Sequence, residues 1–79
     1  MADEVEAYVL IQTSVNAASV ALDIRKLDGV RSADDVSGPY DVIVRLHAAD
    51  VDALGKLVVS SIQTVEGITR TLTCPIVEL

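Results

Sequence analysis

The sequence predicts an α+β fold in which four antiparallel strands form one sheet and two helices cover one face of it. Strand-like and helix-like segments alternate along the chain in the order βαββαβ. The glycines that follow the two helical segments, Gly29 and Gly67, stand 67 − 29 = 38 residues apart in similar surroundings, which indicates two copies of one strand-helix-strand unit. The 79 residues are enough for one small domain.

The first unit begins with residues 5–13, where apolar side chains at consecutive positions indicate a strand that is covered on both faces. From Ala17 onward the apolar residues recur on one side of a helix, and Gly29 can adopt the positive φ that ends it. Residues 30–36 form the second strand. Because this strand contains two adjacent aspartates, we expect it at an exposed edge of the sheet.

The second unit repeats this order. Residues 40–47 form a strand that follows a hairpin turn at Gly38-Pro39, and Asp50 then caps the next helix. Gly55 is expected to let that helix approach the sheet closely. The apolar face of the helix comprises Val51, Leu54, Val58, Ile62 and Val65.

The last strand covers residues 68–79, and Pro75 suits an edge because it cannot donate a ladder hydrogen bond. With right-handed crossovers, this order gives the ferredoxin-like arrangement of the dimeric α/β barrel type. The sheet face away from the helices lacks cover, and we expect Ile43 with Ile11 or Leu10 on it. A second copy, packed back to back in a two-fold dimer, is the simplest cover.

Composition excludes several classes of function. The net charge is −6, from 12 acidic and 6 basic residues, so direct binding to nucleic acid or to an anionic membrane surface is not expected. The apolar runs are far shorter than the roughly 20 residues that cross a bilayer, so we predict no membrane partner. One cysteine, Cys74, and the lack of a secretion signal indicate a cytoplasmic protein, with Cys74 as small buried filler.

The chain also lacks the usual signatures of catalysis. His47 is the only histidine, and no cysteine or second histidine stands at a metal-ligand spacing from it. There is no nucleophile-elbow, phosphate-loop or dinucleotide fingerprint. We therefore predict no catalytic residues, no metal and no cofactor, and a protein that is not an enzyme.

Two groups of residues can be interpreted as a ligand site. Spacing alone favours a structural reading of Gly38 to Asp41, a turn in which the aspartate hydrogen-bonds its own backbone. In the functional reading, Gly38 exposes N–H groups to a carboxylate while Asp41 receives an ammonium, which suits a zwitterion. Thr71 and Thr73 are either ordinary strand residues or hydroxyl donors in a cleft against another subunit.

Three elements in this order resemble the effector-binding domain of the Lrp/AsnC family of feast/famine transcriptional regulators, over nearly the whole chain. They are the aliphatic strand 7–11, the Gly-x-Tyr-Asp hairpin at residues 38–41, and Gly67-Ile68 followed by Arg70-Thr71-x-Thr73. The resemblance implies a homodimer with its sheets face to face. It also implies further assembly of four or five dimers into an octamer or decamer, with an amino acid effector bound between dimers.

Position by position, the resemblance implies that the ligand-binding residues are Ser37, Gly38, Tyr40, Asp41, Thr71 and Thr73. Pro39 stands where the family commonly has a polar or acidic residue, which leaves the identity of the amino acid open. Full-length members carry a DNA-binding helix-turn-helix ahead of this domain, whereas about four residues precede the first strand here. We therefore expect residues 1–79 to be a single, stand-alone effector domain.

The leading hypothesis is a non-enzymatic, oligomeric amino acid sensor that modulates a full-length Lrp/AsnC regulator by forming mixed assemblies with it. One alternative is a small enzyme of the related dimeric α/β-barrel type, such as a monooxygenase or an isomerase, which works in a cavity between the helices and the sheet. We predict His47 as a surface residue at a strand end, and a large cavity with His47 pointing into it would instead favour the enzyme. The other alternative is a module that builds oligomers and binds no ligand.

Overall fold

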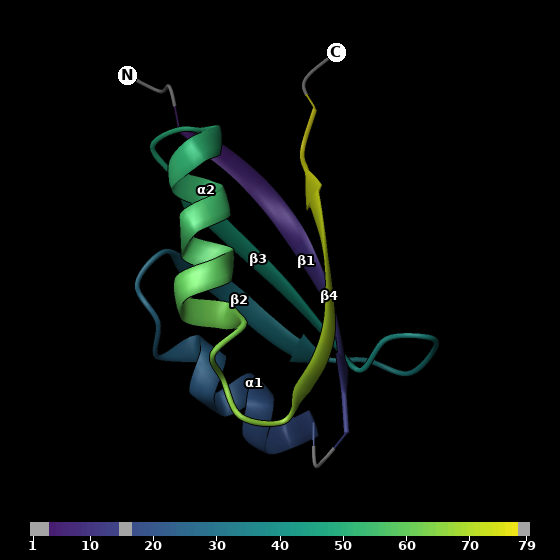
Figure 1. Cartoon of the computed structure of the whole chain (residues 1–79). Coiled ribbons are helices and arrows are strands. Elements are labelled where there is room, and N and C mark those ends of the chain that lie inside the picture. The colour runs from purple at the N-terminus through teal and green to yellow at the C-terminus, as the bar shows by residue number, and fades with distance from the viewer. Residues whose placement is uncertain (1–3, 15–16, 78–79) are drawn as a thin grey trace.

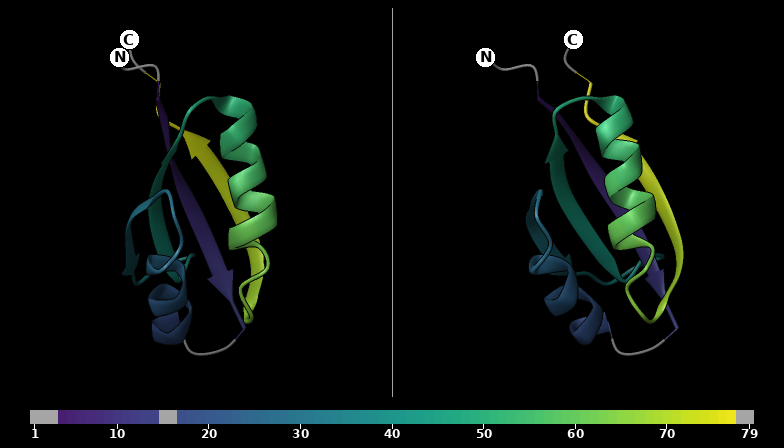
Figure 2. Two further views of the ribbon diagram at one scale, coloured as in Figure 1. Left: turned by 90° about the vertical axis from the view of Figure 1, so that its left-hand side faces the viewer. Right: turned by 60° about the vertical axis from the view of Figure 1, so that its left-hand side comes forward.

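Four antiparallel strands form a single sheet in the order β2-β3-β1-β4, and both helices lie on one face of it (Figures 1 and 2). The computed structural model describes residues 4–14 and 17–77, and the side chains of residues 17 and 18 lie outside this description. The elements are β1 (Val5–Thr13), α1 (Ala17–Arg25), β2 (Val30–Asp35), β3 (Val42–Ala48), α2 (Val51–Leu57), the π-helical turn η1 (Val58–Ile62) and β4 (Ile68–Pro75). The predicted ferredoxin-like fold is confirmed.

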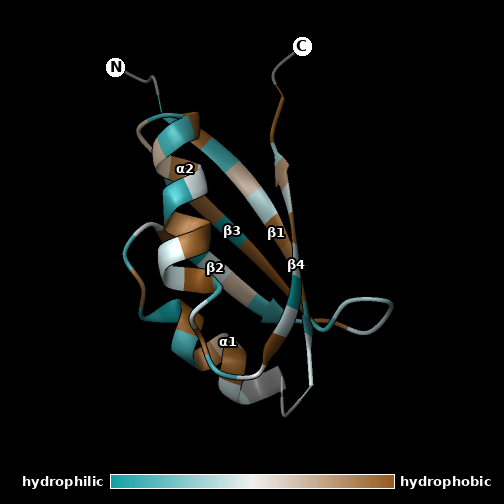
Figure 3. Cartoon of the chain, viewed as in Figure 1, coloured by the Kyte–Doolittle hydropathy of each residue, from teal (hydrophilic) through white to brown (hydrophobic). Residues whose placement is uncertain are grey.

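Several predicted boundaries change by a few residues. Helix α1 ends at Arg25, because Leu27 N donates to Ile24 O at 3.0 Å and closes a tighter final turn before Gly29. Strand β4 ends at Pro75, earlier than predicted, and the last two residues of the predicted strand lie outside the described residues. Strand β2 lies at an edge of the sheet as expected, and Figure 3 shows less hydrophobic colour on it than on β3.

The two glycines of the internal repeat have matching roles. Gly29 and Gly67 have φ of 89° and 101°, a conformation that residues with a Cβ rarely adopt. The carbonyl of Gly29 accepts a hydrogen bond from His47 N at 2.9 Å, and that of Gly67 accepts one from Ser14 N at 2.9 Å. In each unit, the glycine that follows the helix therefore accepts a hydrogen bond from the backbone at the end of the first strand of the other unit.

Replacing Gly29 with alanine is expected to destabilise the fold by about 1–3 kcal/mol. The new Cβ meets Leu57 Cδ2 at 2.9 Å and the carbonyl oxygen of His47 at 3.1 Å, in addition to the strain of the positive φ. Urea unfolding at one fixed chain concentration measures the loss. Lys26→Ala is the control, because Lys26 is an exposed residue just before the same turn and surface substitutions usually change stability by less than about 0.5 kcal/mol. Equal stabilities for the two variants contradict this account.

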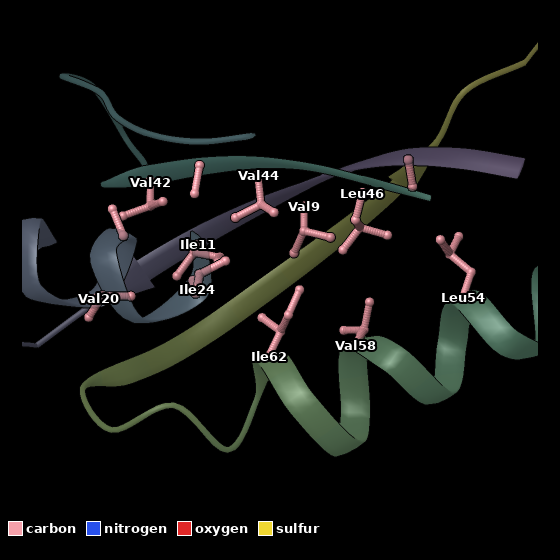
Figure 4. Close-up of a cluster of buried hydrophobic side chains, with 13 residues drawn as sticks. Val9, Ile11, Val20, Ile24, Val42, Val44, Leu46, Leu54, Val58 and Ile62 are labelled. Atoms are coloured by element: carbon pink, nitrogen blue, oxygen red, sulfur yellow. The ribbon is translucent and has the colours of Figure 1, made fainter. Parts of the chain in front are cut away.

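A set of aliphatic side chains between the helices and the sheet forms the core. In Figure 4, Leu54, Val58 and Ile62 point from α2 and η1 toward the sheet, while Val20 and Ile24 approach it from α1. All described residues in the buried set are apolar. The set comprises Ala7, Val9, Ile11, Val20, Ala21, Ile24, Ala33, Val42, Val44, Leu46, Leu54, Val58 and Ile62.

Two predictions about α2 are wrong. Asp50 caps the helix as expected, since its Oδ1 accepts from Ala53 N at 2.8 Å. Val51, however, is 63% exposed. Gly55 does not contact the sheet, because a Cβ there would have no neighbour within 4 Å. Both residues lie with Val59 on a side of the helix that the sheet does not cover.

Within the described residues, no helix is long and apolar enough to span a bilayer.

Candidate functional site

The predicted hairpin site lies in the loop between β2 and β3, which extends beyond the end of the sheet (Figure 1). Val36 N donates to Asp41 O at 2.9 Å and closes the loop. Gly38 has a φ of 143°, which glycine tolerates better than other residues. Ser37 and Gly38 are exposed, whereas Tyr40 and Asp41 are half-buried at the base. The loop therefore presents its tip to solvent on a fixed base.

Asp41 fixes that base to the end of β1. Its Oδ2 accepts hydrogen bonds from Thr13 N at 2.8 Å and from Thr13 Oγ1 at 3.3 Å, and its own N donates to Ile11 O at 2.8 Å. The structural reading of this side chain is therefore corrected, because the carboxylate binds a strand 28 residues away rather than its own turn. Both side-chain bonds use Oδ2, so Oδ1 is the oxygen that can receive a further donor.

Gln12 connects the hairpin to the start of β4. Its Nε2 donates to Pro39 O at 2.9 Å, and its backbone oxygen accepts from Thr69 Oγ1 at 3.2 Å. The loop and the first residues of β4 therefore meet at the same end of β1. Neither Gln12 nor Thr13 was predicted as a site residue, and the only signal for them in the sequence is that polar residues end an otherwise aliphatic strand.

The two threonines lie on the helix-covered side of β4. Thr71 pairs with Ile11 and Thr73 with Val9, and both partners are buried in the core. Thr71 Oγ1 accepts from Gln63 Nε2 at 2.9 Å. A groove of about 370 Å³ runs between β4 and α2–η1. Its lining includes Leu54, Val58, Val59, Gln63, Thr71 and Thr73. The groove therefore offers aliphatic walls with a few hydroxyl and amide groups.

Within one chain the predicted site residues form two separate groups. Strand β1 stands between β3, which follows the hairpin, and β4, which carries the threonines. Among the described residues that line the groove, none belongs to the hairpin. Across the same part of the chain, no three His, Cys, Asp or Glu side chains gather as a metal site would require.

The open face of the sheet carries rows of cross-strand neighbours. One row is apolar and consists of Ile43, Leu10 and Leu72, which come from three adjacent strands. The next row places Tyr8 between Arg45 and Cys74. Leu72 and Tyr8 are 46% and 40% exposed. The apolar row is therefore a stripe of aliphatic surface without cover in the monomer.

The structure decides one open alternative about this face and corrects one expectation. Leu10 rather than Ile11 lies on it, because Ile11 pairs with Val42 on the core side and is fully buried. Cys74 is exposed rather than buried, since its neighbour Tyr8 points to the same open side. Side chains alternate along a strand, so the register of β1 decides both placements.

The open face is also more polar than expected. Glu6 accepts from Arg45 Nη2 at 2.6 Å and from Arg31 Nε at 2.9 Å, and Arg45 lies over the ring of Tyr8 at 5.8 Å. The hydrogen bond from Arg45, with the nearby charge of Arg31, lowers the pKa of Glu6, and the same pairing raises the pKa of Arg45. The apolar row is thus bordered by an ordered cluster of charges.

Glu6→Gln is expected to make the free energy of unfolding depend less on pH in the acid range. The pKa of Glu6 lies below its ordinary value of 4.5 in the folded chain, so the folded state binds fewer protons than the unfolded state near that pH. This carboxylate therefore stabilises the fold above pH 4.5, and that contribution is lost as the pH falls through the lowered pKa. Urea midpoints at about pH 6 and about pH 3.5 should differ less in Glu6→Gln than in wild type. An equal difference in both proteins contradicts the pairing.

His47 lies on the open face rather than among the core residues. Its Nδ1 is 3.1 Å from Glu4 Oε2, and its register partner on β1 is Glu6. The enzyme alternative depends on a cavity between the helices and the sheet, and this histidine pointing into it would have supported that alternative. The structure instead fills that space with aliphatic side chains, so this alternative lacks the feature on which it depends.

A profile of the Lrp/AsnC ligand binding domain matches residues 6–78. An uncharacterised helix-turn-helix transcriptional regulator of Pyrococcus furiosus is 30% identical over 71 residues, which cover 85% of this chain and 47% of the regulator. A homocitrate synthase of Saccharolobus islandicus is 29% identical over 73 residues, which cover 90% of this chain and 16% of the enzyme. The chain thus spans about half of the first relative and about a sixth of the second.

Solved structures share the fold. A protein from Thermus thermophilus superposes with a TM-score of 0.87 at 30% identity, over 95% of both chains. A feast or famine regulatory protein from M. tuberculosis, solved in complex with L-methionine, superposes with a TM-score of 0.80 at 21% identity. That match covers 95% of this chain and 51% of the regulator, and at this identity it shows a common fold.

Proposed function

The chain belongs to the Lrp/AsnC family through its ligand-binding domain, and from that premise we propose that it is an oligomeric sensor whose amino acid effector binds at seams between dimers. The family membership supports a regulatory role in sensing a small molecule. The observation that carries the finer proposal is the projecting hairpin, which extends beyond the sheet of its own chain and is fixed there through Asp41.

The dimer forms through the open face of the sheet. Its apolar row of Ile43, Leu10 and Leu72 spans three strands, and Leu10 lies at its middle. A second sheet packed on this row removes aliphatic surface from water. The charge cluster around Glu6 borders the row, where its ion pairs can stay hydrated at the rim of the interface.

The effector site is completed by a second dimer. Within one chain, β1 lies between the strand that follows the hairpin and the strand that carries the two threonines. A ligand that contacts both groups therefore needs the hairpin of one chain and the groove of another. In such a site Asp41 Oδ1 receives the ammonium and the N–H groups near Gly38 bind the carboxylate. Tyr40 and Ser37 border this end. The groove with Thr71 and Thr73 holds the side chain of the amino acid.

The groove favours an amino acid with an aliphatic or thioether side chain. Leu54 and Val58 form its floor, and the polar groups in its lining are the neutral side chains of Gln63, Thr71 and Thr73. A charged side chain would lose hydration there without gaining an opposite charge. Methionine is the first ligand to test, because the structurally similar regulator from M. tuberculosis was solved with it.

The role of the chain is regulatory rather than catalytic. Related sequence occurs both in a transcriptional regulator and in a homocitrate synthase, of which it spans only a small part. That distribution supports a ligand-binding module used by larger proteins. The net charge of −6 disfavours direct contact with DNA, so the module acts on transcription by assembling with a full-length regulator that binds the DNA.

Thermal unfolding in the presence of each of the twenty amino acids tests the proposal. A ligand that binds only the folded assembly raises Tm with concentration, by an amount that follows its Kd. We expect methionine or another apolar amino acid to raise Tm, and aspartate and lysine to have no effect. The absence of a shift with all twenty at millimolar concentration would contradict a sensing role.

A further inference from the structure

We infer that the side of α2–η1 formed by Val51, Gly55 and Val59 is the seam at which two dimers meet, with the same strip of a second copy as its occupant. This inference rests on the proposed function and assigns its dimer–dimer contact to a surface. Val51 and Val59 are 63% and 62% exposed. The packing of the helix on the sheet therefore does not explain why these two positions carry apolar side chains. A hollow of about 570 Å³ lies along this strip.

The strip is shaped for another helix. Gly55 stands midway between the two valines, and nothing lies within 4 Å of the position its Cβ would occupy. Helices pack more closely where the side chains at their crossing are small. If two copies cross antiparallel at Gly55, the equal spacing brings Val51 of each copy against Val59 of the other. The two glycines then face each other at the crossing, and their lack of side chains lets the valine pairs on either side come into contact.

The charged residues beside the strip can form opposite-charge pairs with the same residues of a second copy. Asp52 and Lys56 line the hollow one turn apart, on either side of Gly55 in the sequence. An antiparallel crossing places Asp52 of each copy near Lys56 of the other, so the same two residues make two opposite-charge contacts. The strip carries no net charge, whereas the whole chain carries −6. A second copy therefore approaches here with less repulsion than an average surface of the chain would impose.

The strip is continuous with the ligand groove. Val51, Gly55 and Val59 border both the hollow on α2 and the groove that contains Thr71 and Thr73. A second copy docked on the strip therefore covers the open side of that groove. An effector in the groove contacts both copies, and its binding favours the assembled state.

Light scattering of two disruptive variants and one compensating variant tests this seam. Gly55→Gln fills the hollow without touching the core, and we expect it to weaken association between dimers at least about 100-fold while leaving the dimer intact. Asp52→Lys brings like charges together, and we expect a weakening of about tenfold. The double variant Asp52→Lys/Lys56→Asp restores opposite charges across the two-fold and should recover most of the wild-type mass.

Retention of the wild-type mass by both Gly55→Gln and Asp52→Lys overturns the seam. If those variants also keep the rise in Tm with an amino acid, the seam is wrong and the proposed function stands. The seam is likewise overturned if the wild-type chain never exceeds a dimer at any concentration or with any amino acid. In that case the change of Tm with each amino acid, measured on the same chain, decides separately whether the chain senses a ligand. Full recovery by the double variant, after loss in the single variant, supports the antiparallel arrangement.

Discussion

Replacing Leu10 with aspartate is expected to convert the proposed dimer into a folded monomer. Leu10 lies at the middle of the apolar row between Ile43 and Leu72, on the sheet face that has no helix. The change removes burial of a leucine, about 1.5–3 kcal/mol, and leaves a carboxylate that loses hydration without a partner, at a cost of several kcal/mol. A two-fold interface contains the change twice, so we expect association at least about 10³-fold weaker. Sedimentation equilibrium measures it.

The control for this variant is Leu22→Asp. Leu22 is 54% exposed on α1, so it receives the same substitution on a surface that plays no part in the proposed assembly. We expect Leu22→Asp to keep the wild-type mass and to lose little stability. Circular dichroism shows whether Leu10→Asp is still folded. A dimer that survives in Leu10→Asp means that the sheets are not the interface.

The variant Asp41→Asn is expected to lose the response to amino acids without losing the fold. The amide oxygen of asparagine can still accept the hydrogen bond from Thr13 N, which Asp41 Oδ2 now receives at 2.8 Å. Asparagine lacks the negative charge that binds the ligand's ammonium in the proposed site. Loss of a charge-assisted contact of this kind is worth roughly 1.5–3 kcal/mol, so the effector's Kd should rise about tenfold to 100-fold. Isothermal titration calorimetry with methionine measures it.

Two further variants separate charge from structure. Asp41→Ala removes the acceptor that Thr13 N uses and should lower the free energy of unfolding by about 1–3 kcal/mol. Asp35→Asn removes the same charge from an exposed neighbour at the end of β2 and should bind like wild type. Wild-type affinity in Asp41→Asn would remove this carboxylate from the site.

The sequence predicts those elements whose two faces differ clearly. The edge position of β2 follows from Asp34 and Asp35, which suit solvent better than a central strand. The cap at Asp50 follows from a side chain that can accept a hydrogen bond at a helix start. Strand β1 is different, because apolar residues occupy both of its faces. Its pattern leaves open whether Leu10 or Ile11 lies inside, and only the pairing with β3 decides this.

Contacts between distant residues account for most of what the sequence could not predict. The Asp41 carboxylate accepts hydrogen bonds from Thr13, 28 residues away. Local turn chemistry instead predicts a hydrogen bond to the backbone of its own turn, which does not form. The cluster of Glu6 with Arg31 and Arg45 likewise forms only when three strands align. The π-helical turn from Val58 to Ile62, where Gln63 N donates to Val58 O at 2.8 Å, has no simple pattern in the sequence.

Sedimentation velocity of the wild-type chain at micromolar concentration, with and without methionine and then the other amino acids, tests the central claim most directly. We predict dimers of the 8.4 kDa chain that associate further, with a distribution that shifts toward the larger assembly when the correct amino acid is added. A well-folded monomer, or an assembly whose mass none of the twenty amino acids changes, would contradict an effector site between dimers.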